Sequence, residues 1–187
     1  MTTQTPVNGV DVARLFETLE AVKEQPELGK FHFRAASEWD DGARTTTKIL
    51  DFYGVGQEDG SRSANPFSLQ SDEPDALLGD NTAPNPTEAV LHALASCLTV
   101  GMVYNAAAQG IKIEKLGFDL EGDLDLRGFL GLEESVRSGY SDIRVTCRVE
   151  ADAPREQLEE LCQYAQAHSP VFDIVTNPVN VTVKLAD

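Results

Sequence analysis

The long apolar run from Ala89 to Ala108 constrains the fold of this chain more than any other feature. The four residues Asn85-Pro86-Thr87-Glu88 precede it and have the pattern of a helix start: an Asn cap, a Pro at the first helical position and a Glu three residues after the cap. We therefore predict a helix from Asn85 to about Gln109, ending at Gly110. Apolar residues surround this helix almost completely, so it must be covered on most sides. One small domain hardly supplies that cover, and we expect a partner subunit.

A membrane span is the alternative interpretation of the same run. Polar residues interrupt the run and no basic flank follows it, so we interpret it as a buried core helix; the interrupting residues are His92, Ser96, Thr99 and Asn105. Residues 1–8 lack the basic and apolar regions of a signal peptide. The chain has 15 basic and 31 acidic residues, and its net charge of −16 repels phosphate groups and anionic lipids. We expect a cytoplasmic protein with no nucleic-acid or membrane partner.

The remaining periodicity predicts a mixed architecture. Strands are expected over Phe31–Trp39, Ala43–Tyr53, Phe67–Gln70, Lys112–Leu126, Asp142–Glu150 and Val179–Leu185. Two further helices are expected over Asn8–Gln25 and Pro154–His168. Asp41-Gly42 indicates a hairpin turn, whereas Gly54–Asn65 and Ser71–Pro84 have the composition of surface loops. Single helices separate these runs of strands without regular βαβ alternation, which favours the α+β class.

The chain has three cysteines, Cys97, Cys147 and Cys162. Their odd number does not fit a disulfide framework, and their spacing lacks the pairs typical of metal ligands. Cys147 falls on the apolar face of a strand and Cys162 on the apolar stripe of a helix, so both are expected to fill the core. Cys97, inside the central helix, is either core filler or a nucleophile. The common nucleotide, hydrolase and zinc-protease motifs are absent from the sequence, and we predict no cofactor and no metal.

The helical projection describes the surroundings of Cys97. Leu94, Gly101 and Tyr104 lie on the same side of the helix as the thiol. Apolar walls alone favour the protonated, unreactive thiol, so a reactive Cys97 needs a cation from another segment. The candidates are Arg34, Arg44 and Arg127. Glu88 is a possible orienting carboxylate for such an Arg, but it projects about 180° away from Cys97 on an ideal helix, and a capping box explains it more simply.

Several of these motifs together resemble the OsmC/Ohr family of osmotically inducible and organic hydroperoxide resistance proteins. The segments are Asn85–Glu88, the run Leu-His-Ala-Leu-Ala-Ser-Cys ending at Cys97, residues 122–129, and Ser169–Asp173. The resemblance covers residues 31–185. It implies an OsmC-like domain over residues 29–187 after a helical extension over residues 1–28. It also implies an intertwined homodimer in which two central helices lie buried against β-sheets.

The resemblance further implies roles for individual residues. In active family members, a cysteine at the place of Cys97 attacks an organic hydroperoxide, a hairpin Arg activates it, and a Glu in the first turn of the helix supports that Arg. Arg44 and Glu88 are the counterparts here, although the family's Glu stands where this chain has Thr87. The family's second cysteine corresponds to Ser169, whose hydroxyl cannot resolve a sulfenic acid. Tyr104, Leu94, Gly101 and Ser169 are the expected substrate-binding residues.

Two functions remain open from the sequence. The first is a thiol-dependent peroxidase that reduces organic hydroperoxides through Cys97, with an external thiol as reductant. The second is a non-catalytic protein that binds a small molecule or lipid in the same pocket. The missing second cysteine and the shifted Glu favour the second function. The apolar recess around Cys97 favours alkyl or aryl peroxides over hydrogen peroxide as substrates of the first, and we place the peroxidase slightly ahead.

Overall fold

The computed structural model describes residues 5–186, which form two compact units. The hairpin unit comprises residues 13–90, and the core unit comprises residues 91–186 with residues 5–12. The division into domains at residues 28 and 29 stays a prediction, and the part of the signal-peptide prediction that rests on residues 1–4 falls outside the described residues.

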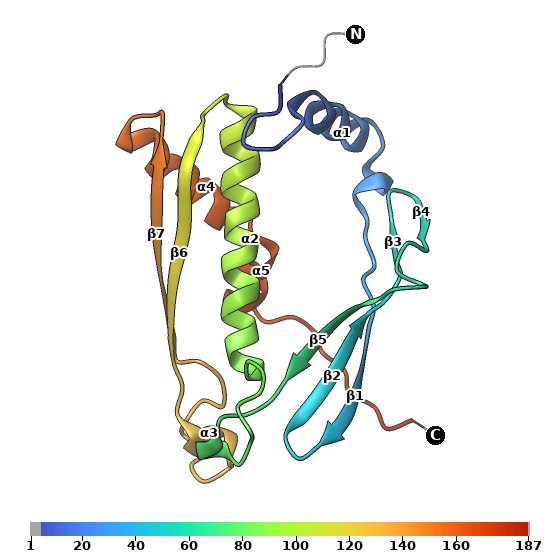
Figure 1. The fold of residues 1–187 in the computed structure, drawn as a ribbon, viewed down its shortest axis with the longest axis vertical. Helices are drawn as coiled ribbons and strands as arrows, with labels where there is room; N and C mark the ends of the chain where they lie inside the picture. Colours follow the sequence, from blue (N-terminus) through green and yellow to red (C-terminus); the bar gives the residue numbers. More distant parts are fainter. Residues whose placement is uncertain (1–4, 187) are drawn as a thin grey trace. The chain divides into compact units, whose positions relative to one another are not determined.

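The hairpin unit is built around a three-stranded antiparallel sheet with the order β1-β2-β5 (Figure 1). Its strands are β1 (Ala35–Asp41), β2 (Arg44–Ile49) and β5 (Phe67–Ser71). The predicted turn at Asp41-Gly42 is confirmed, and Gly42 adopts a φ of 55° that suits glycine. The predicted first strand begins later than expected, at Ala35. The predicted second strand is divided, because β2 ends at Ile49 and a separate strand, β3 (Phe52–Gly54), follows.

The segment predicted as a loop over Gly54–Asn65 holds part of a second hairpin, so that prediction was wrong in part. Strand β3 pairs with β4 (Gln57–Asp59) across a tight turn at Val55-Gly56. Both turn residues have positive φ, 50° and 78°. A β-branched residue rarely adopts that conformation, so the sequence carried no recognisable hairpin signal here.

A helix begins the hairpin unit. The predicted helix over Asn8–Gln25 is confirmed as α1 (Val12–Glu24), followed by the short 3-10 helix η1 (Pro26–Gly29). The helix starts four residues late because Asn8 and Gly9 form a turn with positive φ. The Asn8 side chain, in the core unit, instead donates to the carbonyl of Ile111 and accepts from the backbone N–H of Ile113. This amide therefore fixes residues 5–12 to the start of strand β6.

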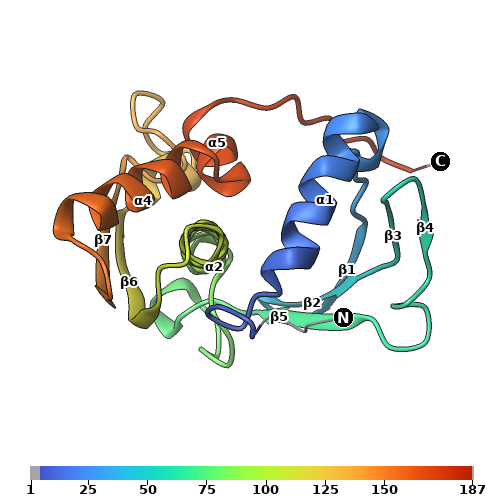
Figure 2. The ribbon, with the colours of Figure 1, turned by 90° about the horizontal axis from the view of Figure 1, so that it is seen from above.

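The core unit packs two helices on one antiparallel strand pair. Strands β6 (Ile113–Asp123) and β7 (Asp142–Ala151) pair along almost their whole length and confirm the two predicted strands. Helices α2 (Pro86–Ala108) and α4 (Arg155–Ala167) confirm the two predicted helices (Figure 2). The short helices α3 (Leu126–Phe129) and α5 (Pro170–Thr176) were not predicted. The buried core consists of Met102, Ala106, Ile111, Leu161 and Ala165.

Among the described residues, helix α2 is buried along one side. Its buried residues form one stripe: Leu94, Leu98, Met102, Ala106 and Ala107. On other sides, Val100 is 50% exposed and Tyr104 is 48% exposed. Among residues 5–186, α2 is the one helix long and apolar enough to cross a membrane. Since its buried stripe packs against the strand pair and α4, α2 is the core helix of this unit.

The predicted C-terminal strand is not formed in this chain. Residues 178–186 have no strand assignment, and the alternating apolar residues from Val179 to Leu185 are exposed, the last of them by 98%. An alternating pattern defines an apolar face but supplies no hydrogen-bonding neighbour, and a strand needs both.

Candidate functional site

Cys97 lies in the middle of α2 and is half-buried. The hydroxyl of Ser169 donates a hydrogen bond to its sulfur, with 3.1 Å between Ser169 Oγ and Cys97 Sγ. Ser169, which the sequence resemblance predicts to replace a second cysteine, therefore contacts the candidate nucleophile directly. The other two cysteines, Cys147 and Cys162, pack against the same buried core and line one pocket.

Ser169 is held in this position from two directions. It is the N-cap of α5, where its Oγ accepts a hydrogen bond of 3.1 Å from the backbone N–H of Phe172. Only 5% of Ser169 is exposed. The hydroxyl thus accepts from the helix end and donates to the sulfur, and capping fixes the direction of its proton.

The predicted pocket residues have different surroundings in the structure. Leu94 is buried in the stripe of α2, whereas Tyr104 is half exposed on another side of the helix. Gly101 provides room for α4: a Cβ at this position would lie 3.1 Å from the Cβ of Ala165. The absence of a side chain at Gly101 therefore allows two helices to pack closely. The space one turn after Cys97 is occupied by the protein itself.

Glu88 forms the capping box that its spacing predicts. Its carboxylate accepts from the backbone N–H of Asn85 at 2.9 Å, and its own N–H donates to the Asn85 side chain at 2.8 Å. These reciprocal bonds satisfy two backbone donors at the start of α2. The role of Glu88 as the support of Arg44 stays a prediction; the carboxylates paired with Arg44 in this structure are Asp80 and Asp41.

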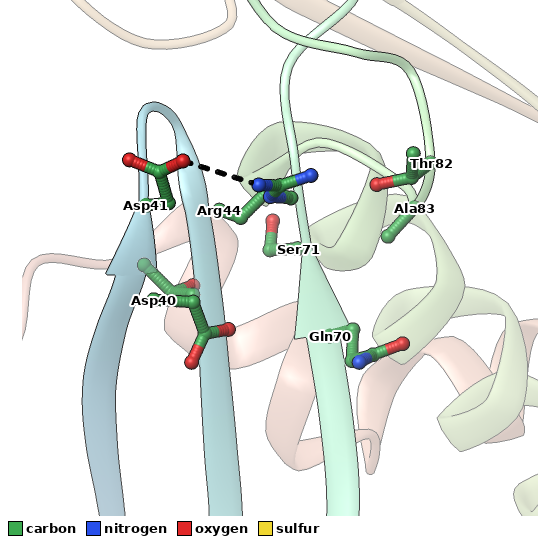
Figure 3. Close-up of a pocket in the computed structure, with 8 residues that line it drawn as sticks. Asp40, Asp41, Arg44, Gln70, Ser71, Thr82 and Ala83 are labelled. Carbon is green, nitrogen blue, oxygen red and sulfur yellow. Dashed lines mark hydrogen bonds and ion pairs between the residues drawn. The ribbon is translucent and has the colours of Figure 1, made fainter.

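Arg44, at the start of β2, lies at the rim of a pocket of about 480 Å³ in the hairpin unit (Figure 3). Its guanidinium forms ion pairs with Asp80 at 3.1 Å and with Asp41 at 3.4 Å. Residues from β1, β2 and β5 and from the segment before α2 line the pocket: Asp40, Asp41, Thr45, Gln70, Ser71, Thr82 and Ala83. Ion pairs this exposed contribute little to stability, so their main effect is to orient the guanidinium.

A buried aspartate organises the loop that carries Asp80. Asp72 is 1% exposed, and its carboxylate accepts from the backbone N–H of Glu73 and from both the N–H and the hydroxyl of Thr82. The hydrogen bonds from Thr82, above all, lower the pKa of Asp72 from 3.8 to about 2. Sequence reasoning took residues 71–84 for a surface connection and missed this acid. The signal was an Asp directly before a Glu-Pro turn, which is typical of side-chain to backbone bonding.

The other two candidate cations have their own carboxylate partners. Arg34 forms a two-point ion pair with Glu58 of β4, with both N···O distances 2.8 Å. Arg127 pairs with Asp125, the residue that caps α3. Among residues 5–186, no group of three or more His, Cys, Asp or Glu side chains is placed to hold a metal ion.

Comparison with known proteins gives one consistent result. A model of the family described as OsmC-like protein matches residues 79–184, more than half of the chain. An OsmC-like protein from Mycoplasma pneumoniae is similar in structure, with a TM-score of 0.60 and 14% identity over 79% of this chain and 89% of that one. An OsmC-like protein of unknown function from Vibrio cholerae gives a TM-score of 0.54 and 15% identity over 78% and 94%.

An organic hydroperoxide resistance protein OsmC from Legionella pneumophila gives a TM-score of 0.52 and 17% identity over 78% of this chain and 89% of that one. A comparison with curated protein sequences found no match. At these identities the structural likeness establishes the fold, and the predicted α+β, OsmC-like fold is confirmed.

Proposed function

Because the chain belongs to the OsmC-like protein family, we propose that it is a thiol-dependent peroxidase that reduces organic hydroperoxides through Cys97. The observation that carries the proposal is the hydrogen bond from the Ser169 hydroxyl to the Cys97 sulfur. The bond holds the sulfur in one place beside a polar hydroxyl, and a cysteine attacks a peroxide as its thiolate. Ser169 thus supplies the sulfur with a donor and leaves it without a neighbouring thiol.

The proposed reaction has two stages. The Cys97 thiolate attacks the terminal oxygen of the hydroperoxide, the O–O bond breaks, and the alkoxide takes up a proton and leaves as the alcohol. Cys97 is then a sulfenic acid. An external thiol attacks this sulfur and releases water, and a second thiol cleaves the resulting mixed disulfide and restores Cys97. An external reductant is required because Ser169 cannot form a disulfide.

We assign to Arg44 the role of the cation that stabilises the thiolate and the leaving oxygen. Its position directly after the hairpin turn and its pocket of about 480 Å³ support this role. Asp80 and Asp41 orient the guanidinium, so the supporting carboxylates belong to the loop and hairpin of the same unit. Glu88 contributes by capping α2. Leu94 and Tyr104 remain proposed substrate contacts.

The test measures cumene hydroperoxide consumption with a monothiol and with a dithiol as reductants. Cys97→Ser and Arg44→Met are each expected to reduce the rate strongly. Thr99→Ser, a small change on the same helix that keeps the side-chain hydroxyl, is the matched control and should keep the rate. Sulfenic acid on Cys97, trapped by a carbon nucleophile and located by mass spectrometry, supports the same conclusion. Equal rates for wild type and Cys97→Ser would refute the peroxidase proposal.

The second candidate function is a non-catalytic protein that binds an apolar small molecule or lipid. Ser169 in the place of a second cysteine favours it, because a bound ligand needs no disulfide. A thermal shift assay against fatty acids and aryl compounds separates the two functions, since a ligand that binds only the folded state raises the midpoint. A raised midpoint together with no peroxide consumption would favour the binding protein.

We further propose that two chains interlock into a cytoplasmic homodimer. Three apolar surfaces support it: one side of α2, one face of the β1-β2-β5 sheet with Trp39, Phe67 and Leu69, and residues 178–186. A soluble monomer rarely leaves this much apolar surface uncovered. Sedimentation analysis should give a dimer, and Val181→Lys should weaken it. Thr182→Lys, on the opposite side of the same extended segment, is the control; a monomeric wild-type protein would contradict the proposal.

A further inference from the structure

Cys147 and Cys162 form a contact that the proposed peroxidase reaction does not use. Cys147 lies on β7 opposite Phe118 of β6, and Cys162 lies on α4. Both pack against the buried core and line the same small pocket. Burial, together with the neighbouring Cys162, raises the pKa of Cys147 from 9.0 to about 12. A strand and a helix thus bring the two cysteines to one place.

The two thiols also open into a small pocket. They line a hollow of about 220 Å³ together with Val149, Leu158, Arg155 and Glu159. Arg155 and Glu159 form an exposed ion pair of 2.7 Å. Both cysteines are half-buried, so the pair is accessible to a small molecule that enters this hollow. Two core-filling cysteines would need neither mutual contact nor a shared opening.

We propose that Cys147 and Cys162 are a second, oxidisable dithiol site, which closes to an intramolecular disulfide when a hydroperoxide enters this pocket. Cys162 attacks the terminal oxygen, the O–O bond breaks, and an alcohol or water leaves with a proton, so that Cys162 becomes a sulfenic acid. Cys147 then attacks that sulfur, its proton leaves with the hydroxide as water, and the S–S bond forms. In total, the two thiols lose two electrons and two protons, and the peroxide is reduced.

Contact between the sulfurs decides between a disulfide and further oxidation. A sulfenic acid without a neighbouring thiol proceeds to the sulfinic acid when more peroxide is present. Here the second thiol lines the same pocket, so its capture of the sulfenic acid is intramolecular. The site is separate from Cys97, whose own partner is Ser169. The proposal does not depend on peroxidase activity.

The experiment uses Cys97→Ser protein in its native state, so that only this pair contributes thiols. Treatment with hydrogen peroxide, and in parallel with the azo oxidant diamide, should lower the count of free thiols from two to none. The protein mass should fall by two hydrogen atoms, and a reductant should reverse the change. Peptide mapping should recover Cys147 and Cys162 in one linked peptide pair, and the same pair should form in the wild-type protein.

The controls leave one thiol of the pair. Cys162→Ala and Cys147→Ala, each combined with Cys97→Ser, should show sulfenic or sulfinic acid and no internal disulfide. Two free thiols after excess diamide, or separate sulfinic acids on both cysteines of the intact pair, would overturn the proposal. The protein used lacks Cys97, so absence of the Cys147–Cys162 disulfide would not affect the peroxidase proposal for Cys97. Loss of the peroxidase proposal would likewise not affect the proposed dithiol site.

Discussion

Replacing Ser169 with cysteine is the most informative perturbation of the site. The Ser169 oxygen lies 3.1 Å from the Cys97 sulfur, and an S–S bond is about 2.05 Å long. A shift of about 1 Å therefore suffices for a disulfide at this position. We expect Ser169→Cys to form it after one equivalent of organic hydroperoxide: the new thiol attacks the Cys97 sulfenic acid and water leaves.

The size of the effect follows from the separation of 72 residues between the two positions. Closing a loop of that length restricts the unfolded chain and stabilises the folded state by about 4 kcal/mol. For a chain of this size, that corresponds to a rise in Tm on the order of 10 °C between the reduced and the oxidised variant. The reduced variant itself should be less stable than wild type by about 1 kcal/mol, because cysteine is a poor cap for α5.

The assay combines a thiol count with thermal unfolding, with and without a reductant. Ser169→Ala is the matched control, since it loses the same cap and gains no thiol. It should lose stability in the same way and show no dependence on reductant. The reasoning would be refuted if the peroxide-treated Ser169→Cys protein kept all its thiols while folded, or formed a disulfide without any rise in Tm.

Three further predictions concern stability. Asp72→Asn should destabilise the hairpin unit at pH 7. The folded-state pKa of Asp72, about 2, lies below the ordinary value of 3.8, so the carboxylate stabilises the fold above pH 3.8 and this contribution is lost as the pH falls from 3.8 to 2. The free energy of urea unfolding of the variant should therefore depend less on pH between 2 and 3.8 than that of the wild type. An unchanged pH profile would contradict this. Gly101→Val should lower the free energy of unfolding, measured by chemical denaturation, by about 1–3 kcal/mol, because its Cβ would lie 3.1 Å from the Cβ of Ala165. An unchanged denaturation midpoint would contradict this and show that α4 can shift away without loss of stability. Met102→Ala, at a fully buried position, should lower the free energy of unfolding by about 2–5 kcal/mol. Val100→Ala, at a half-exposed position, is the control and should lower it much less. Equal losses would argue against the observed core.

The elements whose signals are local were predictable from the sequence. The capping box at Asn85 and Glu88 joins residues three apart, and it formed as the spacing predicts. The turn at Asp41-Gly42 and the alternation along β7 are of the same kind. The hairpin at Val55-Gly56 was missed because Val55 adopts the left-handed backbone region, which β-branched residues rarely occupy, so the sequence does not indicate a turn there. The segment Val179–Leu185 has the alternating pattern of a strand, but it pairs with no strand among residues 5–186.

Local sequence signals were enough to predict where α2 begins, how apolar it is and that Cys97 lies within it. They did not predict that Ser169 donates to that sulfur, that Gly101 makes room for Ala165, or that Asp80 orients Arg44; these contacts arise from the packed fold. The same packing brings Cys147 and Cys162 to one pocket. The two groups of features differ in how far apart the interacting residues lie along the chain. Hydrogen bonds between residues a few positions apart follow from local backbone geometry, whereas contacts between distant residues depend on how the helices and strands pack.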